Sequence, residues 1–484
     1  MSFELCLMLS HLVLPRPQEP CILLEATEPP ATKSCPAPSL ATLPYELKQE
    51  IVDHLAASVK PANRTRLAPL MGFFEERAAE QRRRRWVAEM LRPLSLIDRA
   101  CRSACEPYLW QALALRNSRS SSLVPFLREV LPEHAGTVKA FHQGGSFAFY
   151  RRNNCTADTT EGEKASLITT AEEATGVTDL QVRYSRAHVL LETAIFKACS
   201  HVQEVVLRSE ILAPPTTEQQ DDLVQAVLSR GDQITALTLE FASGDAGPVI
   251  QACPNLASLD LYQAPYSEDA PRETRTLGRF DYSSVRDALL SLQHLRHLKL
   301  DASQLLTLDF LRSPFPFHLE TLDVQDRSCR AALSSFQLFF SRFADTLTSL
   351  SFYTKKATKI GRLKKAFLLP RLRHLALGSS FSREVLTLFA PSPLATLRLG
   401  LCAMLEPDDV IDELVGPCSD TLLRVHAEED FYREADPFVR FGAYATEHDR
   451  VEDVAEACAE IGVRFTCDDP HRHEGCEKCG WKQW

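Results

Sequence analysis

The segment LRHLKL, residues 295–300, decides the fold of this chain. Leucine occupies its first, fourth and sixth positions, and the same spacing of three apolar residues returns through most of the sequence. Because side chains alternate along a strand, the fourth and sixth residues point to one side, which predicts a short, half-buried strand in each copy. Nine copies begin at Val202, Ile234, Leu256, Leu295, Leu319, Leu347, Leu372, Leu394 and Leu422.

Most of these copies follow one another at or near the roughly 20 to 29 residues of leucine-rich repeats. The longer interval after Leu256 predicts an inserted loop at residues 266–280. Weaker copies extend the array at 138–141, 177–182 and 461–465, and helix-like stretches lie between copies at 221–228, 285–292, 333–343 and 410–414. The pattern predicts an α/β fold over residues 130–466: an irregular leucine-rich-repeat solenoid with a curved parallel sheet and helices on its convex side.

A doubly wound α/β domain is the alternative, since it also alternates strands and helices. The fixed apolar spacing and the lack of a glycine-rich phosphate loop after any strand make it the lesser choice. The Asn or Cys that usually follows the last apolar position by three residues is nearly absent, and only Cys402 occupies it. The convex turns must therefore satisfy their backbone groups in another way.

The chain before the repeats begins with a proline-rich segment, residues 1–41, which we expect to be disordered or extended. Leu43, Leu47, Ile51 and Leu55 then recur every four residues and predict an amphipathic helix. A second helical stretch after Pro93 and a third from residue 107 complete a three-helix module at 42–116, which is interrupted by an insert at about 56–92.

This module resembles the F-box family. Its first helix opens with Leu43, Pro44 and Leu47 and continues with Ile51 and Leu55, and its later part has a Cys-Arg pair and a closing Leu-Trp. The resemblance implies a substrate receptor of an SCF-type ubiquitin ligase, which docks on a Skp-type adaptor, and through it a cullin, while the repeats hold a protein substrate. The residues implied to bind the adaptor are Leu43, Pro44, Leu47, Ile51, Leu55, Leu94, Ile97, Leu109 and Trp110.

The insert at 56–92 is longer than the link that the family usually has, which puts the docking geometry in doubt. Four consecutive arginines at 82–85 stand beside Trp86 in a stretch that predicts an inserted basic helix. They could form a nuclear import signal or contact an anionic surface. A solvated helix face balanced by nearby glutamates is the commoner outcome for such a run.

Strand residues between and just after the apolar positions should line the concave face of the sheet. They show no single sign of charge and no aromatic stripe, so an ordinary solvated sheet face is about as good an interpretation as a binding site. The predicted substrate-binding residues on this face are Asp260, Tyr262, His297, Lys299, Asp323, Tyr353, His374 and Arg398.

The C-terminal tail, residues 467–484, holds the one metal-like cluster of the sequence. Cys467, His471 (or His473), Cys476 and Cys479 could surround a zinc ion tetrahedrally, although a flexible, unligated tail is the favoured interpretation. The chain otherwise implies no cofactor. Nucleophile-elbow, Walker-type and His-Glu-x-x-His motifs are absent from the sequence, so we expect no catalytic residue and no enzyme activity.

The bulk composition agrees with an interaction protein. A net charge of −10 disfavours nucleic acid as the main partner, and the apolar runs are too short for a membrane span. Fifteen cysteines scattered through apolar segments favour reduced thiols and a cytoplasmic or nuclear protein. The alternative to a ligase receptor is a leucine-rich-repeat interaction scaffold whose helical module is only an N-terminal cap.

Overall fold

The computed structural model describes residues 40–58, 83–84, 86–115, 125–143, 169, 184–212, 222–263, 282–301, 305–326, 333–354, 366–378, 387–400, 411–428 and 454–467. The chain divides into two compact units, Met1–Pro44 and Tyr45–Trp484. The described part of the first unit holds one short 3-10 helix, η1 (Leu40–Thr42), after which the Leu43 amide donates to the Leu40 carbonyl at 3.3 Å. The rest of the predicted leader, residues 1–39, lies outside the described residues. All elements below belong to the second unit.

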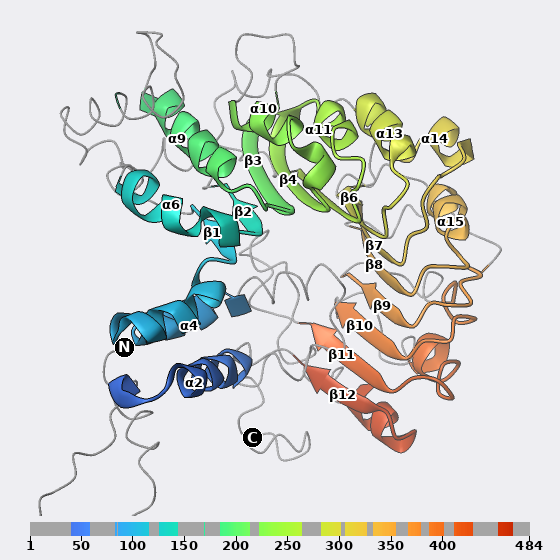
Figure 1. The fold of residues 1–484 in the computed structure, drawn as a ribbon. Helices are drawn as coiled ribbons and strands as arrows, with labels where there is room; N and C mark the ends of the chain where they lie inside the picture. The colour runs from blue at the N-terminus through green and yellow to red at the C-terminus, as the bar shows by residue number, and fades with distance from the viewer. Residues whose placement is uncertain are drawn as a thin grey trace, which may run out of the picture. The chain divides into compact units, whose positions relative to one another are not determined.

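Twelve strands of the second unit form one parallel sheet, in which the strands follow one another in the order of the sequence (Figure 1). This order excludes the doubly wound alternative, whose strand order reverses at a switch point. The strands are β1 (Ala112–Ala114), β2 (Ala140–His142), β3 (Glu204–Leu212), β4 (Ala236–Gly244), β5 (Ser258–Gln263), β6 (His297–Asp301), β7 (Thr321–Asp326), β8 (Ser349–Thr354), β9 (His374–Leu377), β10 (Thr396–Gly400), β11 (Arg424–Glu428) and β12 (Arg464–Cys467).

The sheet confirms the repeat prediction copy by copy. Each of the nine copies provides one strand, from β3 to β11, and the weaker copies at 138–141 and 461–465 provide β2 and β12. The copy at 177–182 and the loop at 266–280 lie outside the described residues. Strand β1 was not predicted, because its three residues fall inside the range that we assigned to the helical module.

Helices lie along one side of the sheet and leave its other side to the strands (Figure 1). Predicted helical stretches at 221–228, 285–292 and 333–343 correspond to α10, α13 and α15, while the chain at 410–414 forms a π-helical turn, η8. The helical elements of the array are η4 (Phe126–Val130), α6 (Leu131–His134), η5 (Ala135–Thr137), α9 (Tyr184–Ala198), α10 (Asp222–Leu228), η6 (Gly231–Gln233), α11 (Gly247–Gln251), α13 (Tyr282–Ser291), α14 (Leu308–Arg312), α15 (Leu333–Ser341) and η8 (Ile411–Val415).

The apolar positions of the motif form the core between strands and helices. Leu295, Leu298 and Leu300 are each at most 1% exposed, and burying a leucine stabilises the fold by about 1.5–3 kcal/mol. In the middle of the array the core is built from aromatic rings. A continuous chain of phenylalanine contacts, with centroids 4.7–6.5 Å apart, joins Phe310, Phe315, Phe317, Phe336, Phe339, Phe340, Phe343, Phe352, Phe367 and Phe389.

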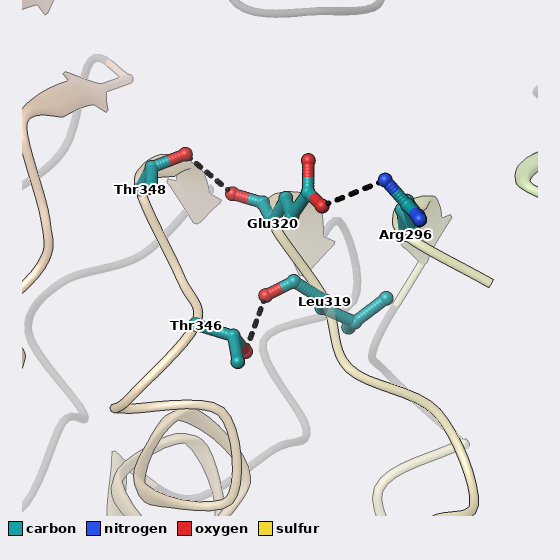
Figure 2. Close-up of polar contacts among 5 residues, drawn as sticks. All are labelled: Arg296, Leu319, Glu320, Thr346 and Thr348. Atoms are coloured by element: carbon teal, nitrogen blue, oxygen red, sulfur yellow. Dashed lines mark hydrogen bonds and ion pairs between the residues drawn. The ribbon is translucent and has the colours of Figure 1, made fainter. Parts of the chain in front are cut away.

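Threonine side chains join successive repeats just before the first apolar position of the motif. The Thr346 hydroxyl donates to the carbonyl of Leu319, the first apolar residue of the preceding repeat, at 2.8 Å (Figure 2). Thr421 repeats this contact on the carbonyl of Leu394 at 2.8 Å. These bonds satisfy backbone oxygens that would otherwise stay unpaired on burial, whereas the positions of the usual asparagine, such as residues 327 and 402, lie outside the described residues.

Two arginines cap helices of the preceding repeat. Arg230, which follows α10, donates to the carbonyl oxygens of Phe196 and Cys199 at the end of α9, at 3.1 and 3.0 Å. Arg342, which follows α15, donates to the Leu311 carbonyl in α14 at 3.1 Å. Since the last carbonyls of a helix have no partner within it, each arginine supplies bonds that the helix cannot make itself.

The helical module contains α2 (Tyr45–Ser58), a helical segment at 86–91, the 3-10 turn η3 (Leu94–Leu96) and α4 (Arg99–Leu109). Its core combines Val52 and Ala56 of α2, Val87 and Leu91 of the segment at 86–91, and Ala104 and Cys105 of α4. The segment at 86–91 comes from the predicted insert, yet it is one of the three helices that pack together.

The prediction of a separate third helix from Pro107 was wrong, since Pro107 lies inside α4. A proline lacks the amide that a helix interior needs, and α4 ends two residues later at Leu109. Trp110 and the first sheet strand follow directly. Within the described ranges, no helix combines the length and the apolar character that crossing a membrane requires.

Candidate interaction surfaces

The sheet presents ordered rows of side chains on the side opposite the helices, which we call the open face. Its first row follows the third position of the motif and its second row the fifth position. Parallel pairing in register places Asp260 beside Lys299, Lys299 beside Asp323, and Arg398 beside His426 in the second row. These rows place the predicted face residues together on one side of the sheet.

The predicted substrate residues all lie at open-face positions of their strands. His297 and His374 belong to the first row, Asp260, Lys299, Asp323 and Arg398 to the second, and Tyr262 and Tyr353 to a third. The described side chains among them are partly buried. The side chain of Tyr262 lies outside the described part of the structure. Their role in binding a substrate stays a prediction.

An ion pair organises the middle of the open face. Lys299 Nζ lies 3.3 Å from Asp323 Oδ2, and both side chains are partly buried. A pair on the surface contributes at most about 1 kcal/mol to stability, so its main effect is to hold both side chains in place. The face is therefore preorganised here.

Histidine–threonine contacts organise the later strands. His374 Nδ1 lies 2.8 Å from the Thr396 hydroxyl, and His426 Nδ1 lies 3.0 Å from the Thr466 hydroxyl. Burial and the nearby Arg373 lower the pKa of His374, so its imidazole is neutral at neutral pH. Both histidines thus connect neighbouring strands, and His374 does so as an uncharged group.

The helical module reaches the beginning of the open face, a contact that the sequence did not indicate. Arg84 Nη1 lies 3.7 Å from Glu204 Oε2 at the start of β3, and His142 Nε2 lies 3.9 Å from the other oxygen of the same carboxylate. Arg83 donates to the Ala56 carbonyl at the end of α2, at 3.2 Å. Two of the four consecutive arginines therefore hold the module together and against the sheet.

A second link joins α4 to the first repeat. His134 Nδ1 lies 2.6 Å from Glu106 Oε1, and the Trp110 ring stacks on the His134 ring with centroids 4.3 Å apart. Trp110, predicted to bind the adaptor, is thus engaged with its own chain. Leu55, Leu94 and Leu109 also pack against the core of the module.

Two of the predicted adaptor residues remain exposed in the second unit. Leu47 is 45% and Ile97 42% exposed, and they are joined by Tyr45 at 45% and Leu96 at 81%, which the prediction did not include. Ile51 is partly buried in α2. Leu43 and Pro44 belong to the first unit.

The exposed Leu47 and Ile97 flank a partly buried ion pair. Lys48, 5% exposed, donates to Asp98 Oδ2 at 2.7 Å, and Asp98 also accepts from the Cys101 amide as the N-cap of α4. The bond from Lys48, followed by that from Cys101, lowers the pKa of Asp98. This pair fixes α2 against the start of α4, so the two apolar side chains next to it have defined positions.

The predicted zinc cluster cannot be placed, since His471, His473, Cys476 and Cys479 lie outside the described residues. Cys467 forms the end of β12, where it pairs with Ala427. Within the described ranges, His, Cys, Asp and Glu side chains gather in no group of three or more that could hold a metal ion.

Among solved structures, the chain is weakly similar to a bacterial internalin. A crystal structure of an internalin from Listeria monocytogenes strain 4b F2365 matches 69% of this chain and 91% of its own, with 13% identity and a TM-score of 0.27. No protein-family model matches the chain. No curated protein matches it either.

Proposed function

We propose that this protein is an interaction scaffold that binds a partner protein on the open face of its sheet. The observation that carries the proposal is the twelve-stranded sheet itself, which buries one side under helices and presents polar side chains in register on the other. In this proposal the chain binds and performs no bond chemistry, and it needs no metal at its tail.

The dimensions of the open face suit a protein partner. Twelve strands spaced about 4.8 Å apart extend over about 50 Å, and five residues of strand cover about 17 Å. Their product is about 850 Å², close to the roughly 800 Å² that each partner contributes to a stable protein interface. A small-molecule site would instead need a deep, mostly apolar cavity.

Substitutions on the open face test this proposal. Ser351→Arg with Ala376→Arg places two bulky charges in the second row, where neighbouring side chains point away from the core. Leu308→Arg is the matched control, because Leu308 is 59% exposed on α14 at the helical side. Proteins that the tagged, unmodified chain captures should be lost when the double variant is used and retained when the control variant is used. Equal capture by all three would remove the proposal.

A second candidate is the substrate receptor of an SCF-type ubiquitin ligase, in which the helical module docks on a Skp-type adaptor. The exposed Tyr45, Leu47, Leu96 and Ile97 favour it, since a small helical module rarely leaves several large apolar side chains in water without a partner. The sequence resemblance to the F-box family supports the same candidate.

Co-expression with a Skp-type adaptor tests this second candidate. Leu47→Glu with Ile97→Glu should abolish co-purification of the adaptor, and both positions are exposed enough to leave the fold intact. Leu308→Glu, at a leucine that is even more exposed and lies far along the chain, should keep it. Failure of the unmodified chain to retain the adaptor rejects the ligase candidate and leaves the scaffold proposal standing.

A further inference from the structure

We draw no further inference here: the strongest candidate, the apolar pocket that Phe340, Phe367 and Leu368 line beside the end of α15, carries nothing because no observation within the described ranges shows what covers it.

Discussion

Arg230→Ala should strongly weaken the contact between the repeats of α9 and α10. The guanidinium of Arg230 donates to three carbonyls at the end of α9, those of Phe196, Lys197 and Cys199, and lies 5.5 Å from the centre of the Phe196 ring. Alanine removes all of these contacts at once and leaves the helix end without its cap.

The magnitude follows from the burial of each contact. The bonds to Phe196 and Cys199 are partly buried, and charge-assisted bonds contribute about 1.5–3 kcal/mol each in net terms. The bond to Lys197 is exposed, so water replaces it at little cost. The ring contact adds about 0.5–1 kcal/mol. Because the contributions overlap and water enters the gap, we expect a loss of about 2–4 kcal/mol.

Urea unfolding followed by circular dichroism measures the loss, and hydrogen exchange locates it. Amides of α9 and β4 should lose protection, while those of β10 and β11 should keep it, because each repeat contacts only its neighbours. Arg230→Lys keeps the positive charge but loses the branched guanidinium, so its loss of stability should lie between that of Arg230→Ala and zero. Arg296→Ala, which breaks an exposed pair with Glu320 at 3.3 Å, should cost under about 0.5 kcal/mol. A loss for Arg230→Ala no larger than for Arg296→Ala would refute the reasoning.

Three further outcomes are expected. Gly231→Ala should destabilise the fold by about 2 kcal/mol or more in thermal melts, since its β-carbon would lie 1.8 Å from a backbone oxygen. Gly136→Ala is the control and should be neutral, because its β-carbon would meet nothing within 4 Å. Thr346→Val should cost about 1 kcal/mol in urea unfolding by removing the hydrogen bond to the partly buried Leu319 carbonyl. Burial raises the pKa of the Cys253 thiol from 9.0 to about 12, so the native state keeps a proton that the unfolded chain releases. The contribution of this thiol to the free energy of unfolding should therefore be level below pH 9 and fall as the pH rises from 9 toward 12, and Cys253→Ala should reduce the loss of stability in that range.

The repeat motif predicted the sheet well because it encodes a local requirement. Each copy must place the same apolar positions against its neighbours, so Leu295 and its counterparts fix both the strands and their register. The short strand β1 was missed because local spacing alone assigned its residues to a helix. Leu109, Trp110 and Leu113 have a helical spacing, and only pairing with β2 makes Ala112–Ala114 a strand.

The contacts of the helical module could not be predicted from spacing. Glu204 and Arg84 lie 120 positions apart in the sequence, and no periodic pattern relates them. The same holds for Lys48 and Asp98, although an aspartate just before a helix is a recognisable N-cap.

The helical module supports the first strand of the sheet, which limits the experiments that can test whether it also docks on an adaptor. β1 continues directly from α4 and forms the first strand of the sheet, and Trp110 stacks on His134 of the first repeat. A solenoid needs such a cap, since its first strand would otherwise expose an unpaired edge. Deleting the module would therefore unfold the first repeats whether or not it binds an adaptor. Loss of adaptor binding is informative only for changes at the exposed Leu47 and Ile97, which the cap does not use.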